Sequence, residues 1–238
     1  MIRDYYDLHS SPEEETIAKI IEFAEKLELA GICIAIPAEK KEDLDAAAKE
    51  IADIDTEIDI LLGAKISAEN PEIMRKKIEK LRDCVDLIII VGGDVAINRA
   101  ACENPKVDIL SHPSSNRKDS GMDHVMMALA AKNKVAIELN FKSVLMSYSK
   151  IRVHVLSHQQ EIVNLANHAN AMVIVASGAK SIWDMRAGRE LATLAVMCGM
   201  DREKAVNTAS DVPKSIVDRV RNIKDKNSVM PGVKVLEK

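Results

Sequence analysis

Short apolar runs recur along the chain and alternate with stretches that have the spacing of amphipathic helices. The runs have the length of strands and lie at residues 5–9, 32–36, 58–62, 86–91, 107–110, 135–139 and 172–176. Their first residues are 21 to 37 positions apart, which accommodates one strand, one helix and two loops. Because neighbouring parallel strands need such crossovers, the pattern predicts repeated β-α units around a parallel sheet.

Capping residues predict where several helices begin and end. Ser11, followed by proline and three glutamates, predicts a helix start, and Gly31 predicts the end of that helix. Asn70, also followed by proline, predicts a second start. Ser120 is expected to cap the helix that follows the fifth run.

Two architectures fit repeated β-α units: a closed barrel and an open, doubly wound sheet. The regular spacing and the length of 238 residues favour the barrel, and no GxGxxG motif follows the first run. The chain beyond residue 201 reads as a helix, a break at residues 212–213 and a basic helix at about 214–226. We therefore predict one domain, residues 1–238. It is an irregular TIM-like α/β barrel of about seven parallel strands, with helices where the last strand belongs.

Composition excludes several classes of protein. No apolar run is long enough to cross a bilayer, and the N-terminus lacks the apolar segment of a secretory signal. The four cysteines are widely spaced without a CxxC pair, which fits a reduced cytoplasmic protein better than a disulfide framework or a zinc knot. We expect a cytoplasmic protein with no membrane partner.

The charge is distributed unevenly. The net charge is −4, but residues 1–94 hold 12 Lys/Arg and 23 Asp/Glu, whereas residues 95–238 hold 21 and 14. This split indicates either a basic side that meets a polyanion or simply acidic solvent faces on the first helices. Because aromatic residues make up only 3% of the chain, any bound RNA would be held through phosphates and shape rather than by base stacking.

Unusual polar residues gather where the predicted strands end, which is where βα barrels carry their chemistry. His9, His112 and Glu138 are candidates for a divalent-metal site. The set is thin, and histidines that are merely hydrogen bonded at a barrel mouth explain it better. No nucleophile elbow of the GxSxG type is present.

Two loops have features of phosphate sites. Gly92-Gly93-Asp94 allows close backbone approach at a helix start, although Asp94 as the cap would repel phosphate. Arg117 and Lys118 precede another predicted helix and could hold a phosphate with its amides, or Arg117 could pair internally beside capping residues. Both interpretations of the second loop remain open.

A third basic group spans the last two strand exits and the helices after them. It comprises Lys142, Lys150, Arg152, Lys180, Arg186 and Arg189. With Arg219, Arg221, Lys224 and Lys226 near the C-terminus, it either forms one positive face or is an ordinary solvated surface.

Five blocks between residues 91 and 141 resemble the archaeal ribonuclease P protein component 3 family, whose eukaryotic counterpart is the thirty-kilodalton subunit. In chain order, they read VGGD (91–94), INRAA (97–101), VDILSHP (107–113), RKDSGMDHV (117–125) and VAIELNF (135–141). Their order and spacing make the resemblance specific, and the flanking β-α rhythm extends it over the whole chain.

The resemblance implies a seven-stranded TIM-like barrel similar to polymerase-and-histidinol-phosphatase-type phosphoesterases. It also implies a subunit of the ribonucleoprotein that removes the 5′ leader from precursor tRNA. The RNA would perform the Mg²⁺-assisted hydrolysis, and the chain would hold no tightly bound cofactor and no catalytic residue. Expected partners are the ribonuclease P RNA, precursor tRNA within the holoenzyme, and protein component 2, in a heterotetramer.

RNA contacts are expected at six basic residues. Arg99, Arg117 and Lys118 lie in matching blocks, and Lys142 lies at a block edge, whereas Lys180 and Arg186 rest on charge and position. Two alternatives remain: a stand-alone metal-dependent phosphoesterase that uses His9, His112 and Glu138, and a module that binds only protein.

Overall fold

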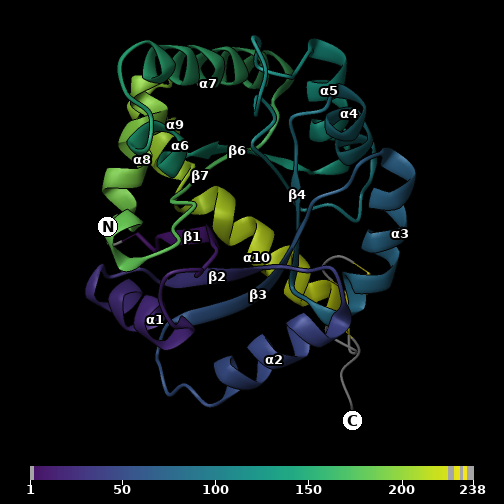
Figure 1. Ribbon diagram of the computed structural model, residues 1–238, viewed down its shortest axis with the longest axis vertical. Coiled ribbons are helices and arrows are strands. Elements are labelled where there is room, and N and C mark those ends of the chain that lie inside the picture. Colours follow the sequence, from purple (N-terminus) through teal and green to yellow (C-terminus); the bar gives the residue numbers. More distant parts are fainter. Residues whose placement is uncertain (1–2, 225–227, 231–232, 235–238) are drawn as a thin grey trace.

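Seven parallel strands form a nearly closed barrel in which each strand pairs with the next along the chain (Figure 1). The computed structural model describes residues 3–224, 228–230 and 233–234. The strands are β1 (Tyr6–Ser10), β2 (Gly31–Pro37), β3 (Asp59–Ile66), β4 (Leu87–Val91), β5 (Ile109–Ser111), β6 (Ala136–Asn140) and β7 (Val173–Ala176). Every predicted run is a strand, and the sequential order excludes the doubly wound sheet.

Helices cover the outside of the barrel between the strands (Figure 1). They are α1 (Ile17–Lys26), α2 (Lys41–Ala52), α3 (Pro71–Leu81), α4 (Val95–Glu103), α5 (His124–Asn133), α6 (Phe141–Leu145), α7 (Ser149–Ala169), α8 (Gly188–Met197), α9 (Arg202–Asn207) and α10 (Asp211–Lys224), with 3-10 turns at Arg82–Cys84 and Ile182–Asp184. The short strands β8 (Ser228–Met230) and β9 (Val233–Lys234) pair antiparallel. Among the described helices, none has the length and apolarity to cross a membrane.

Local capping signals predicted some helix ends and failed at others. The Asn70 side chain caps α3 by accepting from the Ile73 amide at 3.0 Å, as expected. Ser11 is not a cap, because its side-chain oxygen accepts from the Lys65 ammonium at 2.7 Å, and Thr16 caps α1 instead. Gly31 begins β2 rather than ending α1, and Asp123, not Ser120, caps α5.

The barrel interior is apolar and is closed at one end by α10. Side chains from all seven strands form this core together with Ile216, Val217 and Val220 of α10. Pro213 lies in the first turn of α10, where a missing amide donor is tolerated. The predicted break at residues 212–213 is therefore wrong, and α10 runs unbroken to Lys224; the predicted residues 225–226 lie outside the described part of the chain.

The seam between β7 and β1 is bridged by the turn between α9 and α10 rather than by an eighth strand. The amide of Val175 donates to the carbonyl of Thr208 at 3.1 Å, and the amide of Tyr6 donates to the carbonyl of Ala209 at 2.9 Å. Nearer the other end, β1 and β7 meet directly, since Gly178 donates its amide to the His9 carbonyl at 2.9 Å. Helical segments thus stand where the last strand belongs, as predicted.

Candidate functional site

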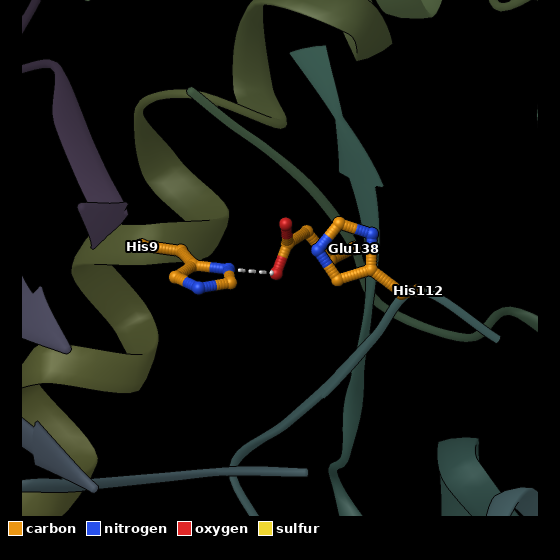
Figure 2. Close-up of side chains that lie close together, drawn as sticks. All are labelled: His9, His112 and Glu138. Carbon is orange, nitrogen blue, oxygen red and sulfur yellow. Dashed lines mark hydrogen bonds and ion pairs between the residues drawn. The ribbon is translucent and has the colours of Figure 1, made fainter. Parts of the chain in front are cut away.

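Three residues that are far apart in the sequence converge at the carboxyl end of the barrel strands. His9 lies near the end of β1, His112 follows β5 and Glu138 lies in β6. One donor atom from each lies within 4.8 Å of the other two. Figure 2 shows the His9 ring and one edge of the His112 ring directed toward the Glu138 carboxylate from opposite sides. The predicted candidates therefore form one cluster.

A β-bulge directs His9 into this cluster. Asp7 pairs with Ile32 and Ser10 with Ile34, so Leu8 and His9 together oppose the single residue between them in β2. An uninterrupted strand would alternate its side chains between faces, and the extra residue breaks that alternation. The His9 side chain consequently faces the barrel interior together with Glu138. Ala136, two residues before Glu138 in β6, faces the same interior.

The cluster is buried and electrostatically coupled. His9 Nδ1 and Glu138 Oε2 lie 2.8 Å apart, with both side chains at most 2% exposed. Burial opposes ionisation of Glu138, but the charge and hydrogen bond of His9 outweigh it, and the pKa of the carboxyl lies well below its usual range. Burial is the main cause that lowers the pKa of His112.

The turn Gly92-Gly93-Asp94 is a structural cap rather than a phosphate cradle. Asp94 accepts from the amides of Ala96 and Ile97 at 2.8 and 3.1 Å. The Gly93 amide is already used, because it donates to Asn98 Oδ1 at 3.0 Å. The φ of 119° at Gly93 accounts for the glycine.

The Arg117 side chain pairs internally. Its Nε and Nη2 donate to the two carboxylate oxygens of Asp119 at 2.6 and 2.8 Å, and its Nη1 reaches the Gly93 carbonyl at 3.3 Å. Because α5 begins only at His124, this loop does not sit at a helix N-terminus. Lys118 is exposed and forms no ion pair with any residue that the structure describes.

Lys142, Lys180 and Arg186 come together beside β6 and β7. Lys142 pairs with Asp184, whose carboxylate also accepts from the Lys180 amide. The Lys180 ammonium pairs with Glu13. Arg186 lies over the Phe141 ring at 5.3 Å. These cations form a real cluster, but nearby carboxylates offset much of its charge.

The remaining predicted cations lie elsewhere. Arg99 is on α4 and pairs with Glu103 one helical turn away. The basic residues of α10 lie at the opposite, amino end of the strands, where Arg219, Arg221 and Lys224 pair with Asp108, Asp59 and Asp86. These three residues therefore do not contribute to the single positive face considered from the sequence, because each forms an ion pair with an aspartate at the start of a strand. Lys226 lies outside the described part of the chain.

Two hollows were not predicted from the sequence. A cleft of about 640 Å³ runs between the β5–α5 loop and α7, and both Glu138 and Lys118 line it. A wider groove of about 880 Å³ at the amino end of the strands includes Lys132 and Lys134. Neither could be found from the sequence, because each is lined by elements that meet only in the fold.

Comparison with known proteins gives one consistent family. The family model described as RNase P subunit p30 matches residues 4–225. A protein from Methanococcoides burtonii named ribonuclease P protein component 3 is 36% identical over 99% of this chain and 95% of its own length. One of the same name from Methanothermobacter thermautotrophicus is 31% identical over 92% and 90%.

Solved structures agree with this assignment. A chain in a cryo-EM structure of archaeal ribonuclease P with mature tRNA matches with a TM-score of 0.84 at 28% identity, over 98% of both chains. A putative histidinol phosphatase from Listeria monocytogenes shares only the fold, with a TM-score of 0.55 at 12% identity over 78% of this chain and 98% of its own. On this evidence the chain belongs to the RNase P subunit p30 family.

Proposed function

We propose that this chain is the p30-type protein subunit of a ribonuclease P that removes the 5′ leader from precursor tRNA, and that it supports a catalytic RNA. The observation that carries the proposal is the match of the whole barrel, over 98% of both chains, to a chain of an archaeal ribonuclease P solved with tRNA. Mg²⁺-assisted hydrolysis belongs to the RNA in this proposal.

RNA contact is assigned to the basic residues at the carboxyl end of the barrel and beside it. They are Arg99, Arg117, Lys118, Lys142, Lys180 and Arg186. Lys118 is the strongest of these, because it is exposed beside a cleft and has no carboxylate partner among the described residues. The other five make internal contacts, so phosphate binding there requires sharing or exchanging those contacts.

Binding to RNA also requires help from a partner protein. A net charge of −4 disfavours tight binding of the isolated chain to a polyanion. We assign this help to protein component 2, in a heterotetramer that forms in the cytoplasm. Free cysteines at all four positions are compatible with that reduced compartment.

Cleavage of precursor tRNA in a reconstituted system tests the proposal. The RNA, component 2 and this chain are combined in Mg²⁺, and control reactions omit the RNA or this chain. We expect cleavage to need the RNA, and we expect this chain to lower the Mg²⁺ concentration that cleavage requires. Cleavage by this chain without the RNA would overturn the supporting role and favour a metal-dependent phosphoesterase.

A further inference from the structure

We propose that His9, His112 and Glu138 form a binding site for one divalent transition-metal ion, with Zn²⁺ as the best-fitting ion. Two imidazoles and one carboxylate that offer donor atoms within 4.8 Å of one another are the three-ligand set of zinc sites that keep a fourth position open. Mg²⁺ prefers oxygen ligands, so this site differs from those that serve the RNA. This site replaces the expectation of no bound metal, which followed from the small number of candidate ligands.

Neighbouring side chains hold two of the three ligands in a metal-ready orientation. Ser143 Oγ lies 3.3 Å from His112 Nδ1, which leaves the other ring nitrogen of His112 facing Glu138 (Figure 2). Asn140 Nδ2 donates to Glu138 Oε1 at 2.6 Å, which leaves Oε2 toward His9. Hydrogen bonds of this kind to the outer atoms of ligands are typical of metal sites.

The backbone is also arranged around the cluster. The bulge in β1 directs His9 inward, and His112 adopts a φ of 52°. A non-glycine residue in the left-handed region costs free energy unless the surroundings enforce it. Both irregularities lie at residues of this cluster, the bulge at His9 and the positive φ at His112.

An unpaired polar atom adjoins the ligands. Ser111 Oγ is buried and makes no hydrogen bond within the described residues. Leu110 of β5 pairs with Ile137 of β6. The next residues along the two parallel strands, Ser111 and Glu138, are therefore neighbours. Buried hydroxyls are normally satisfied, and a water bound at the open metal position would supply the missing partner.

Ion binding needs only small movements. Donor atoms around a tetrahedral zinc ion lie roughly 3.3 Å apart at bond lengths of about 2.0–2.1 Å. His9 Nδ1 and Glu138 Oε2, now 2.8 Å apart, must separate by about 0.5 Å to reach that spacing. The proton that they share passes to solvent as the ion takes its place. The cleft along α7, which His112 and Glu138 line, provides an entry path.

Nearby lysines oppose the ion. Lys65, Lys142 and Lys180 line a small pocket with His9 and His112. Lys142 and Lys180 pair closely with Asp184 and Glu13, whereas the Lys65 ammonium donates to Ser11 Oγ at 2.7 Å. Its charge weakens cation binding. Replacing Lys65 with methionine, which keeps much of the volume, should therefore tighten Zn²⁺ binding.

The test is Zn²⁺ titration of the full, tag-free chain against a chromophoric chelator after metal removal. We expect one equivalent to bind and to raise the melting temperature. His112→Ala should abolish binding, and Lys65→Met should strengthen it. Ser143→Ala removes the contact to His112 and the hydrogen bond to Asn140 Oδ1, so it should weaken binding about 10- to 100-fold. Circular dichroism checks the folding of each variant.

The matched control is His154→Ala on α7, where His154 and His158 have ring centroids 6.5 Å apart and offer a competing surface site. This variant should bind Zn²⁺ as the parent does. Loss of binding in His154→Ala, or unchanged binding in folded Ser143→Ala and His112→Ala, would overturn the proposal. Binding of Mg²⁺ with equal affinity would also overturn the assignment of ion class.

Discussion

Arg219 in α10 donates a hydrogen bond to Asp108 at the start of β5, with 2.9 Å between Nη2 and Oδ1. Asp108 also pairs with Arg82 and accepts from the Ile88 amide at 2.9 Å. One buried carboxylate thus joins three distant segments. The neighbouring pairs Arg221–Asp59 and Lys224–Asp86 join the basic last part of the chain to its acidic first part. These two pairs account for part of the charge asymmetry without any external polyanion.

Asp108→Ala should lower the free energy of unfolding by about 3 kcal/mol, because it leaves two arginines and a buried amide without their acceptor. Asp218→Ala is the matched control, since Asp218 forms only a solvent-exposed pair with Lys214 in the same α10 and should cost less than about 0.5 kcal/mol. Urea unfolding measures both values. Equal losses would contradict a structural role for Asp108.

Asn98→Ala should destabilise the loops at the carboxyl end of the barrel. The buried Asn98 amide donates to the carbonyls of Pro113 and Gly121 at 2.9 and 2.8 Å, while its oxygen accepts from Gly93. Losing these contacts should cost about 2 kcal/mol. Hydrogen exchange should accelerate at residues 113–121, and unchanged exchange there would contradict this interpretation. Asn104→Ala, whose side chain caps an exposed turn, is the control.

Lys118→Ala should weaken binding of the reconstituted protein complex to ribonuclease P RNA. Each lost phosphate contact lowers the slope of log affinity against log salt by about one. Lys76→Ala on α3 removes the same charge from an exposed lysine that pairs with Glu72, and it should leave the slope unchanged. Equal slopes for the two variants would remove Lys118 from the proposed RNA-contact set.

Thiol reactivity should single out Cys84. Burial raises the pKa of Cys102 to about 12 and that of Cys198 to about 11, and it also raises the pKa of Cys33 well above its usual value. Thiolates are the reactive form, and Cys84 is only half-buried whereas the other three cysteines are buried. Ellman's reagent at near-neutral pH should therefore modify Cys84 first. All four thiols should react after denaturation, and Cys84→Ser should lose the early phase.

The strands were predictable because each is a short apolar run that can be recognised from neighbouring residues alone. Helix starts were less predictable, because competing partners come from distant segments. Ser11 has a good capping side chain, yet its hydroxyl oxygen is engaged by Lys65. Pro213 signals a break in isolation but fits the first turn of α10. Local propensity therefore located the elements and misplaced some of their ends.

The candidate site was predictable as a set of residues but not as an arrangement. His9, His112 and Glu138 could be named because βα barrels gather such residues at strand ends. The bulge that directs His9, and the bonds from Ser143 and Asn140, depend on registers and loop paths that no short motif specifies. Arg117 shows the reverse case, since its partner Asp119 lies two residues away and internal pairing was one of the two sequence-based interpretations.

The bridged seam between β7 and β1 has a consequence for synthesis on the ribosome. All seven strands have been synthesised once residue 176 is translated, yet the amides of Tyr6 and Val175 donate to the carbonyls of residues 209 and 208, respectively. A nascent chain of intermediate length therefore has unpaired strand edges at this seam, which are prone to pairing with other chains. Productive folding of the barrel must wait until nearly the whole chain has left the exit tunnel.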